Sequence, residues 1–170
     1  MHMNGGFGMI LYRKATLEDL EKIWNRHIAE NPDDLRYLRW KQEFITRNQT
    51  NQVATFVIVA DGSPIGEVTL DFLASGYSGS RELLADGKNT AYITALRIQK
   101  EFEGNGHVSK LMQLMEAYAV KAGFSQLTIG VEAAETRNLS IYLHWGYDKF
   151  VMAEEDDGEL VLFYQKKLNR

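Results

Sequence analysis

The segment from Tyr92 to Ala133 constrains the fold most, because it reads as strand, helix and strand in succession. Tyr92 to Ile98 is an apolar run, and residues 108–122 repeat apolar side chains at helical spacing up to Gly123. Residues 125–133, SQLTIGVEA, then alternate as a second strand. Parallel strands need a long crossover, usually a helix, whereas antiparallel strands can be joined by a tight turn. The segment therefore predicts one parallel crossover.

Hairpins are predicted on both sides of this crossover. Val53 to Ala60 and Ile65 to Phe72 are strand-like runs joined through Asp61-Gly62, a pair typical of tight hairpin turns. Residues 147–153 and 159–168 flank EEDDG in the same way. With a first strand over 10–15, this order predicts an α/β (α+β) fold. Its central sheet is mixed and mostly antiparallel, with about six to seven strands and about four flanking helices.

Local signals place the helices. Thr16 is followed three residues later by Asp19, which predicts a capping box at the start of the first helix. Pro32 suits a first helical turn, so a second helix is expected to begin near it. Residues 136–145 read as a short helix that ends at Gly146, and residues 74–89 read as a long connection.

The strand from Ile65 to Phe72 has one apolar face and one polar face. Side chains alternate across a strand, so every second residue shares a face. We therefore expect the polar face to meet solvent or a wet site. The apolar face carries Val68, Leu70 and Phe72, and the polar face carries Glu67, Thr69 and Asp71.

Composition narrows the classes of partner. The chain has 170 residues, of which 45% are hydrophobic, so one domain with an ample core is expected over 10–170. Residues 1–9 are expected to be a flexible leader or a remnant of expression. A formal charge of -4 predicts no nucleic-acid or membrane partner and favours small molecules. The lack of cysteine excludes disulfides and thiolate chemistry and fits a reducing cytoplasm.

Gly104 and Gly106 precede the predicted helix and admit three interpretations. A nucleotide P-loop fails, because no lysine stands at the required spacing. A dinucleotide fingerprint is weak, because Ser109 takes the place of its third glycine. The third is a pyrophosphate held by free amides at the helix start, where missing side chains allow close approach. From this stretch alone, a tight turn without a ligand is equally compatible.

Two motifs resemble those of the GNAT superfamily of N-acetyltransferases. Residues 96–112, LRIQKEFEGNGHVSKLM, resemble its R-G-x-G-x-G or R-G-x-G-x-A loop, although Glu103 stands at the usual Arg or Gln and Val108 at the final Gly or Ala. Residues 135–150, ETRNLSIYLHWGYDKF, resemble its second motif, in which Tyr142 precedes Gly146 by four residues. Glu135 occupies the usual Asn position there, and Asn138 could replace its contact.

The resemblance implies a cofactor and a fold detail. Family members hold acetyl-CoA on the glycine loop, and their fourth and fifth strands bulge and splay, so that backbone N–H groups face the acetyl oxygen. Carried over to this sequence, the resemblance implies an acetyl-CoA-dependent N-acetyltransferase. The cofactor-binding residues that it implies are Leu96, Ile98, Glu103, Gly104, Asn105, Gly106, His107, Val108, Ser109, Asn138 and Tyr142.

Catalysis also needs an acid and a base. The resemblance implies that the phenol of Tyr142 lies near the CoA sulfur, where it could protonate the thiolate. An ammonium group must lose a proton before it attacks, and the strand Tyr92 to Ile98 carries no acid. Glu67 is the first candidate base and Glu132 the second, although Glu67 is equally compatible with a solvated strand face.

The four histidines are not predicted to bind metal. His107 is interpreted as a loop contact or a surface residue, and His27 and His144 as residues on helix faces. No histidine pair has metal-ligand spacing, so no metal is expected.

The departures from the family pattern leave two functions open. Glu103 repels a pyrophosphate unless it points away or pairs with Lys100 or Lys110, and Val108 is bulky. One hypothesis is acetyl transfer to a primary amine of a small molecule or peptide in a ternary complex. The other is a catalytically weak module that binds or senses acyl-CoA. A homodimer stays open, and the candidates for lining the acceptor site are Arg36, Tyr37, Arg39, Trp40, Tyr77, Arg81 and Glu82.

Overall fold

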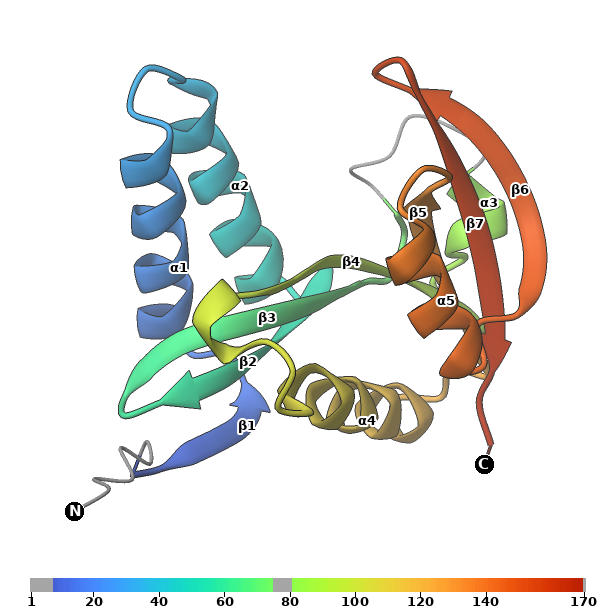
Figure 1. Ribbon diagram of the computed structural model, residues 1–170, viewed down its shortest axis with the longest axis horizontal. Coiled ribbons are helices and arrows are strands. Elements are labelled where there is room, and N and C mark those ends of the chain that lie inside the picture. Colours follow the sequence, from blue (N-terminus) through green and yellow to red (C-terminus); the bar gives the residue numbers. More distant parts are fainter. Residues whose placement is uncertain (1–7, 75–80, 170) are drawn as a thin grey trace. The chain divides into compact units, whose positions relative to one another are not determined.

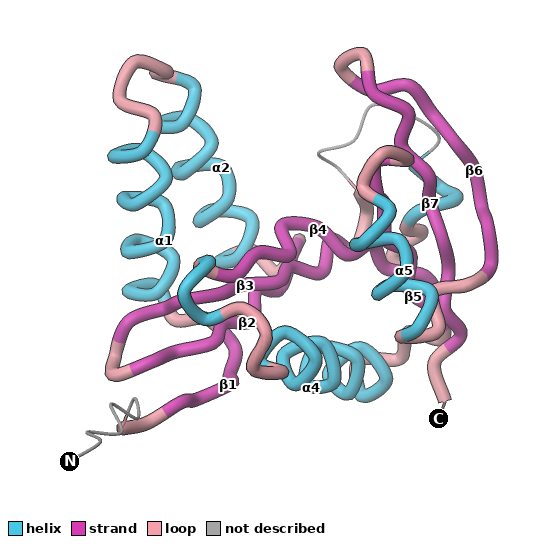
Figure 2. Tube along the Cα trace, viewed as in Figure 1, coloured by secondary structure: helices cyan, strands magenta, loops and turns pink. Residues whose placement is uncertain are grey.

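The structure is a computed structural model that describes residues 8–74 and 81–169. Within these residues, seven strands form one sheet in the order β1-β2-β3-β4-β5-β7-β6. Figures 1 and 2 show these elements along the chain. The strands are β1 (Ile10–Lys14), β2 (Val53–Ala60), β3 (Ser63–Asp71), β4 (Thr90–Ile98), β5 (Gln126–Glu132), β6 (Lys149–Asp156) and β7 (Glu159–Lys167). The helices are α1 (Leu17–Glu30), α2 (Arg36–Gln49), α3 (Arg81–Leu84), the 3-10 turn η1 (Lys100–Phe102), α4 (His107–Lys121) and α5 (Thr136–His144).

Strand pairing confirms the predicted fold class. β4 and β5 run parallel, with Thr90–Ile93 paired to Gln126–Ile129, and α4 lies between them in the chain. The pairs β1 with β2, β5 with β7 and β6 with β7 are antiparallel. The sheet is therefore mixed and mostly antiparallel, with one parallel crossover. Part of the connection predicted over 74–89 is the one-turn helix α3.

The chain divides into two compact units that are described separately. Unit 1 is the described part of Met1–Thr69 together with Ala95–Met115. Unit 2 is the described part of Leu70–Thr94 together with Glu116–Arg170. Strands β3 and β4 each contribute residues to both units.

In unit 1, the start of α1 is fixed by the predicted capping box. The Thr16 hydroxyl accepts from the Asp19 N–H at 3.2 Å, and the Asp19 carboxylate accepts from the Thr16 N–H at 2.8 Å. Asp19 is 3% exposed and also binds the guanidinium of Arg13 on β1. From this start α1 buries Ile23 against Val57 and Val59 of β2 and lies beside α2 (Figure 1).

The predicted start of the second helix was wrong by four residues. α2 begins at Arg36, and Pro32 lies in the preceding turn. The Asp34 N–H donates to the Asn31 carbonyl at 3.1 Å, which closes this turn. The Asp34 carboxylate then accepts from the Arg36 N–H at 3.0 Å. An aspartate that caps the amide two residues on favours a turn over a helix.

The polar face of β3 was predicted to meet solvent or a wet site; it does not meet bulk solvent, and of its three residues Glu67 lines a pocket. Glu67, Thr69 and Asp71 are 4%, 0% and 3% exposed. The Thr69 hydroxyl lies 2.8 Å from the hydroxyl of Thr55, and the Asp71 carboxylate accepts from the Leu73 N–H. Buried polar groups stay in a folded protein when they find partners, and these three have them.

Unit 2 packs its strands around Phe163 of β7. This residue is 1% exposed and lies with Ala74, Leu84 and Ala85, so that α3 closes one side of the cluster. A second group, built around the buried Tyr147, joins α4 to the end of β7. The Tyr147 hydroxyl donates to Glu116 at 2.8 Å, and Lys166 reaches both oxygens of that carboxylate at 3.0 Å.

Candidate functional site

Strand β4 is irregular at Ala95. This residue has φ of +53°, in the left-handed region that residues with a Cβ rarely adopt. The parallel ladder with β5 includes Ile93, two residues earlier. Leu96 and Ile98, whose N–H groups are predicted to orient the cofactor, follow directly in the chain. A left-handed residue re-aims the backbone groups after it, which is how bulges act beside active sites.

Gly66 of β3 allows the backbone of β4 to approach closely at Arg97, near the irregular residue Ala95. A Cβ built there would lie 3.0 Å from the carbonyl oxygen of Arg97 and 2.7 Å from Cδ1 of Ile58. The Gln99 N–H also donates to the Ile65 carbonyl at 2.8 Å. A side chain at position 66 would therefore push β3 away from the irregular part of β4.

The glycine loop leads from η1 into α4. Gly104 and Gly106 have φ of +79° and +78°, and a Cβ added to either would meet nothing within 4 Å. Their role is thus conformational. The Gly106 carbonyl accepts from the Lys110 N–H at 3.2 Å, which makes it the first acceptor of the helix. The N–H groups of the first turn have no acceptor within a helix, so this start can hold an anion.

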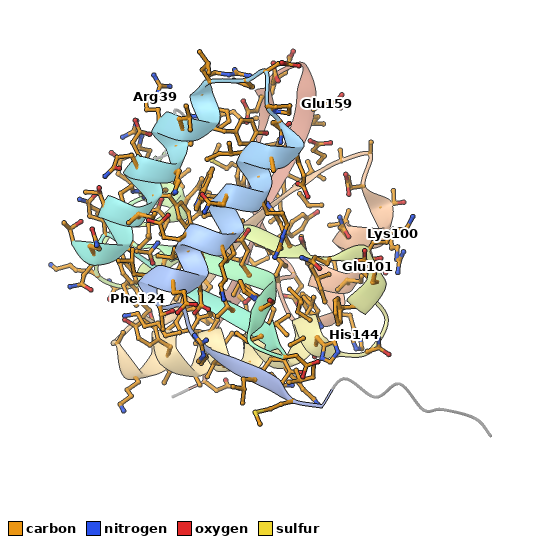
Figure 3. The ribbon with its side chains drawn as sticks, turned by 90° about the vertical axis from the view of Figure 1, so that its left-hand side faces the viewer. Arg39, Lys100, Glu101, Phe124, His144 and Glu159 are labelled. Carbon is orange, nitrogen blue, oxygen red and sulfur yellow. The ribbon has the colours of Figure 1, made fainter. Side chains whose placement is uncertain are left out.

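The glycine loop is stabilised from within by Asn105, whose side-chain amide donates to the Glu103 carbonyl at 3.2 Å. Glu103 itself is exposed, and Lys100 and Glu101 project outward from η1 (Figure 3). Lys110 lies with its Nζ 5.8 Å from the ring centroid of Tyr12. Val108 and Ser109 are half-buried in the first turn of α4.

His107, the first residue of α4, is bound to β1. Its Nδ1 lies 2.6 Å from the hydroxyl of Tyr12, and burial raises the pKa of that phenol above its usual range. The phenol is therefore protonated at neutral pH and can donate to a neutral imidazole. The His107 ring is therefore not a free surface group, because it ties the start of α4 to β1.

Glu67 lines a pocket of about 210 Å³ within unit 1. Its side chain is 6% exposed, and its Oε1 lies 3.3 Å from Nε2 of His27 and 3.6 Å from Nη1 of Arg97. Arg97 Nη1 also lies 2.8 Å from His27 Nε2. The pocket is lined by residues of α1, β3 and β4 and the adjoining Gln99, namely Ile23, Arg26, His27, Glu30, Ile65, Gly66, Glu67, Arg97, Ile98 and Gln99.

Sequence reasoning missed His27 and Arg97 as pocket residues. His27 continues the stripe of Ile23 and Trp24 on α1, and its ring contacts that of Trp24 edge-on, with centroids 5.4 Å apart. A histidine that extends a buried stripe is a weak signal that could have marked it. Arg97 offered none, because one basic residue on a strand is ordinary.

In unit 2, Tyr142 of α5 is half-buried. Burial, together with the nearby Glu135 carboxylate, raises the pKa of its phenol, so the hydroxyl stays protonated through the neutral range. Its ring packs beside Trp145 with centroids 5.9 Å apart. The Asn138 amide donates to Glu135 at 2.6 Å, which ties the two residues of the second motif together. Glu132, the second candidate base, is exposed.

Comparison with protein families matches residues 14–147 to the acetyltransferase (GNAT) family. The chain belongs to this family. The match runs from Lys14, the last residue of β1, to Tyr147 and so includes the glycine loop, the irregular strand β4 and α5. The family predicted from the two motifs, and with it an enzyme of the acyltransferase class, is confirmed.

Solved structures share the GNAT fold at low sequence identity. An N-acetyltransferase from Staphylococcus aureus Mu50 is 18% identical over 95% of this chain and 100% of its own, with a TM-score of 0.68. PaiA N-acetyltransferase from Thermoplasma acidophilum, in complex with coenzyme A, is 21% identical over 94% and 99%, with a TM-score of 0.61. Arabidopsis thaliana NAA60, in complex with acetyl-CoA, is 17% identical over 95% and 100%, with a TM-score of 0.69. Comparison with curated protein sequences gives no match.

The residues predicted to line the acceptor site of this GNAT chain are spread over its elements. On α2, Cζ of Arg36 lies 5.2 Å from the ring centroid of Trp40. Arg39 projects outward from the same helix, and its Nε lies 3.5 Å from Oε1 of Glu43 (Figure 3). Tyr37 packs against Trp40, with ring centroids 4.9 Å apart. The remaining candidates are Arg81 and Glu82, which are exposed on α3, and Tyr77, which lies outside the described residues.

Neither a metal cluster nor a membrane-spanning helix is present in the described part of the chain. Over 8–74 and 81–169, no group of three or more His, Asp or Glu side chains is arranged to hold a metal ion. Within the same ranges, no helix is long and apolar enough to span a membrane.

Proposed function

We propose that the chain is an acetyl-CoA-dependent N-acetyltransferase that transfers an acetyl group to a primary amine of a small molecule or peptide. The main observation in support of this proposal is the loop Gly104–Gly106 at the start of α4. Both glycines have left-handed φ, and a Cβ added to either would meet no atom within 4 Å. Membership of the GNAT family supports it, as does the binding of CoA or acetyl-CoA by two proteins of the same fold.

Acetyl-CoA would be held mainly through backbone groups. The pyrophosphate would accept hydrogen bonds from N–H groups between Glu103 and Ser109, at the positive end of a 15-residue helix. Binding through amides tolerates an exposed Glu103, because its carboxylate can turn toward solvent. Asn138 and Tyr142 of the second motif are the proposed contacts from α5.

The reaction would proceed by direct attack in a ternary complex. A neutral amine attacks the thioester carbonyl carbon, and N–H groups near Leu96 and Ile98 would face the developing oxyanion. Such donors are worth about 3 to 4 kcal/mol in other enzymes. The protonated phenol of Tyr142 is the proposed acid for the leaving thiolate, and Glu67 is the first candidate base, ahead of the exposed Glu132.

Acetyl-CoA binding tests the cofactor site directly. Acetyl-CoA at millimolar concentration should raise the melting temperature, and calorimetry should give the Kd. Gly106→Ala should weaken binding about 10-fold, because a Cβ at left-handed φ costs about 1 to 2 kcal/mol and re-aims the first amides of α4. Gly62→Ala is the matched control: Gly62 has φ of +82° and equally open space, but lies in the β2–β3 turn.

The two glycine variants separate affinity from stability. Both should lose a similar amount of stability, and only Gly106→Ala should lose affinity. Equal affinity in the two variants, or a melting curve unchanged by acetyl-CoA, would overturn the proposed cofactor site.

A screen of primary amines for release of free CoA tests the transfer step. Turnover with any amine supports an enzyme over the second hypothesis, a catalytically weak module that binds or senses acyl-CoA. That hypothesis is based on the exposed Glu103 and the bulky Val108. Tyr142→Phe should slow transfer about 10-fold or more and leave the Kd of acetyl-CoA unchanged. Binding without turnover across a broad screen would favour the sensing module. A reducing, cytoplasmic setting stays a prediction from the cysteine-free sequence.

A further inference from the structure

His27 faces three charged side chains in the pocket of unit 1. Its Nε2 lies 2.8 Å from Arg97 Nη1 and 3.3 Å from Glu67 Oε1, and its Nδ1 lies 3.9 Å from Glu30 Oε2. Its side chain is 16% exposed, compared with 6% for Glu67. The imidazole is therefore the more accessible of the two groups to a molecule that enters the pocket.

These contacts determine where the protons of His27 lie. A guanidinium can only donate, so the short contact from Arg97 requires Nε2 to be an acceptor. The single proton of the neutral ring is then on Nδ1, on the side of Glu30. Nε2 thus carries a lone pair, and a carboxylate oxygen of Glu67 already stands 3.3 Å away.

A proton added at Nε2 would reverse this arrangement. The new N–H would donate to Glu67, the existing N–H would stay beside Glu30, and Arg97 would lose its hydrogen bond to His27 while Glu67 remains 3.6 Å away. Arg97 can make this change, because its side chain is 54% exposed and can turn into water. The fourth charged group of the pocket, Arg26, already donates to the Pro64 carbonyl at 2.7 Å. The resulting imidazolium would therefore face two carboxylates.

We propose that His27, rather than Glu67 itself, accepts the proton from the acceptor's ammonium group, and that Glu67 acts through His27 as a positioning residue that stabilises the imidazolium. An N–H bond of the ammonium breaks and an N–H bond forms at Nε2. The freed electron pair on nitrogen then attacks the acetyl carbon. The C–S bond breaks as the leaving thiolate takes the proton of the Tyr142 phenol, the phenolate recovers a proton from the nitrogen of the new amide, and His27 releases its proton to water. This assignment rests on the proposed acetyltransferase function.

The test compares His27→Gln with wild type, using an amine found by the CoA-release screen. Glutamine keeps polar atoms in the pocket but cannot take up a proton. We expect kcat/KM to fall about 10²- to 10⁴-fold at pH 7.5 and the acidic limb of its pH profile to disappear, with the Kd of acetyl-CoA unchanged. His144→Gln, on the exposed last turn of α5, is the matched control and should behave as wild type.

Two further variants give opposite shifts that a structural role would not produce. Glu67→Gln removes the carboxylate that favours the imidazolium, so the acidic limb should move to lower pH. Arg97→Gln removes the cation that disfavours it, so the limb should move to higher pH. His27→Ala should be rescued in part by added imidazole. In wild-type protein, ¹⁵N spectra should show the Nδ1–H tautomer and a His27 titration that coincides with the kinetic limb.

The outcomes separate this inference from the proposed function. If wild type turns over an amine and His27→Gln keeps its rate and its acidic limb, the assignment to His27 is wrong and the enzyme stands. If wild type binds acetyl-CoA but acetylates no amine, the proposed function fails and the assignment fails with it. If His27→Gln does not fold, the tautomer and titration of the wild-type ring decide: an Nε2–H tautomer at neutral pH overturns the assignment.

Discussion

Asp19→Asn should destabilise unit 1 by removing one charge from the start of α1. The Asp19 side chain is 4% exposed and binds the guanidinium of Arg13, whose side chain is 38% exposed. Asparagine keeps an oxygen for the Thr16 N–H, so the cap survives while the ion pair is lost. Because α1 carries His27, a less stable start of this helix would also disturb the position of His27 in the pocket.

The magnitude follows from the burial of the two partners. Breaking a fully buried ion pair costs about 3 to 5 kcal/mol, but Arg13 can be rehydrated, so about 2 kcal/mol is expected for Asp19→Asn. Asp19→Ala also loses the cap, worth about 1 kcal/mol, and should cost about 3 kcal/mol. In a chain of this length, each kcal/mol lowers Tm by about 2 to 4 °C. Asp19→Asn should therefore melt about 4 to 8 °C below wild type.

Thermal melts across pH test the same contact. Burial acts to raise the pKa of the Asp19 carboxyl, but hydrogen bonds from Arg13 and Thr16 outweigh it and lower the pKa below 3.8. A group with a lowered pKa stabilises the fold above its unfolded value and loses that contribution as pH falls through the folded value. The Tm difference between wild type and Asp19→Asn should thus be constant from pH 5 to 8 and shrink below about pH 4.

The control for Asp19→Asn is Glu18→Gln, which removes the same charge from the same helical turn. The Glu18 side chain is 76% exposed and pairs with Lys22 at 3.0 Å on the same helix face, so the Tm of this variant should stay within about 1 °C of wild type. Equal melting of the two variants, or a Tm difference that does not shrink as the pH falls from 5 to 3, would refute the reasoning.

Variants at three further positions test other features of the structure. Tyr12→Phe should lower stability by about 1 kcal/mol and weaken acetyl-CoA binding a few-fold, because His107 loses its 2.6 Å partner; calorimetry with and without ligand measures both. Tyr147→Phe should cost about 1.5 kcal/mol in urea unfolding and leave the rate of transfer unchanged, because Glu116 keeps its ion pair with a lysine. Ala95→Gly should raise stability by about 1 kcal/mol in urea unfolding, because it removes a Cβ at left-handed φ, whereas Ala95→Val should cost about 2 kcal/mol, because a β-branched residue is poorly accommodated there.

The local parts of the fold could be predicted because each follows from neighbouring residues. The Asp61-Gly62 turn adopts φ of +48° and +82°, as tight hairpins require, and the capping box formed at the predicted pair. The start of α2 was missed because a turn closed by Asp34 competed with the helix-favouring Pro32. The burial of the β3 polar face was missed because alternation tells which residues share a face but not what covers it.

The candidate site shows the same limit. The position of Gly104 and Gly106 at a turn before a helix could be predicted from spacing, because the strand, the loop and the helix are consecutive in the chain. The pocket joins Glu67 to His27, 40 residues earlier in the chain, and to Arg97, 30 residues later. No periodicity connects residues at such separations. Only the folded chain shows that a histidine of α1 meets a carboxylate of β3.

The glycines of this chain differ in how freely evolution or a designer can replace them. Gly104 and Gly106 have open space around them, so their constraint is one of backbone angle alone, and Asn or Asp, which tolerate left-handed φ, should be recovered there from a randomised library. Gly66 has no such freedom, because any Cβ would collide with the Arg97 carbonyl. A homologue that lacks the glycines of the loop can therefore retain the same loop geometry, whereas one that lacks the glycine of β3 must have rebuilt the strand.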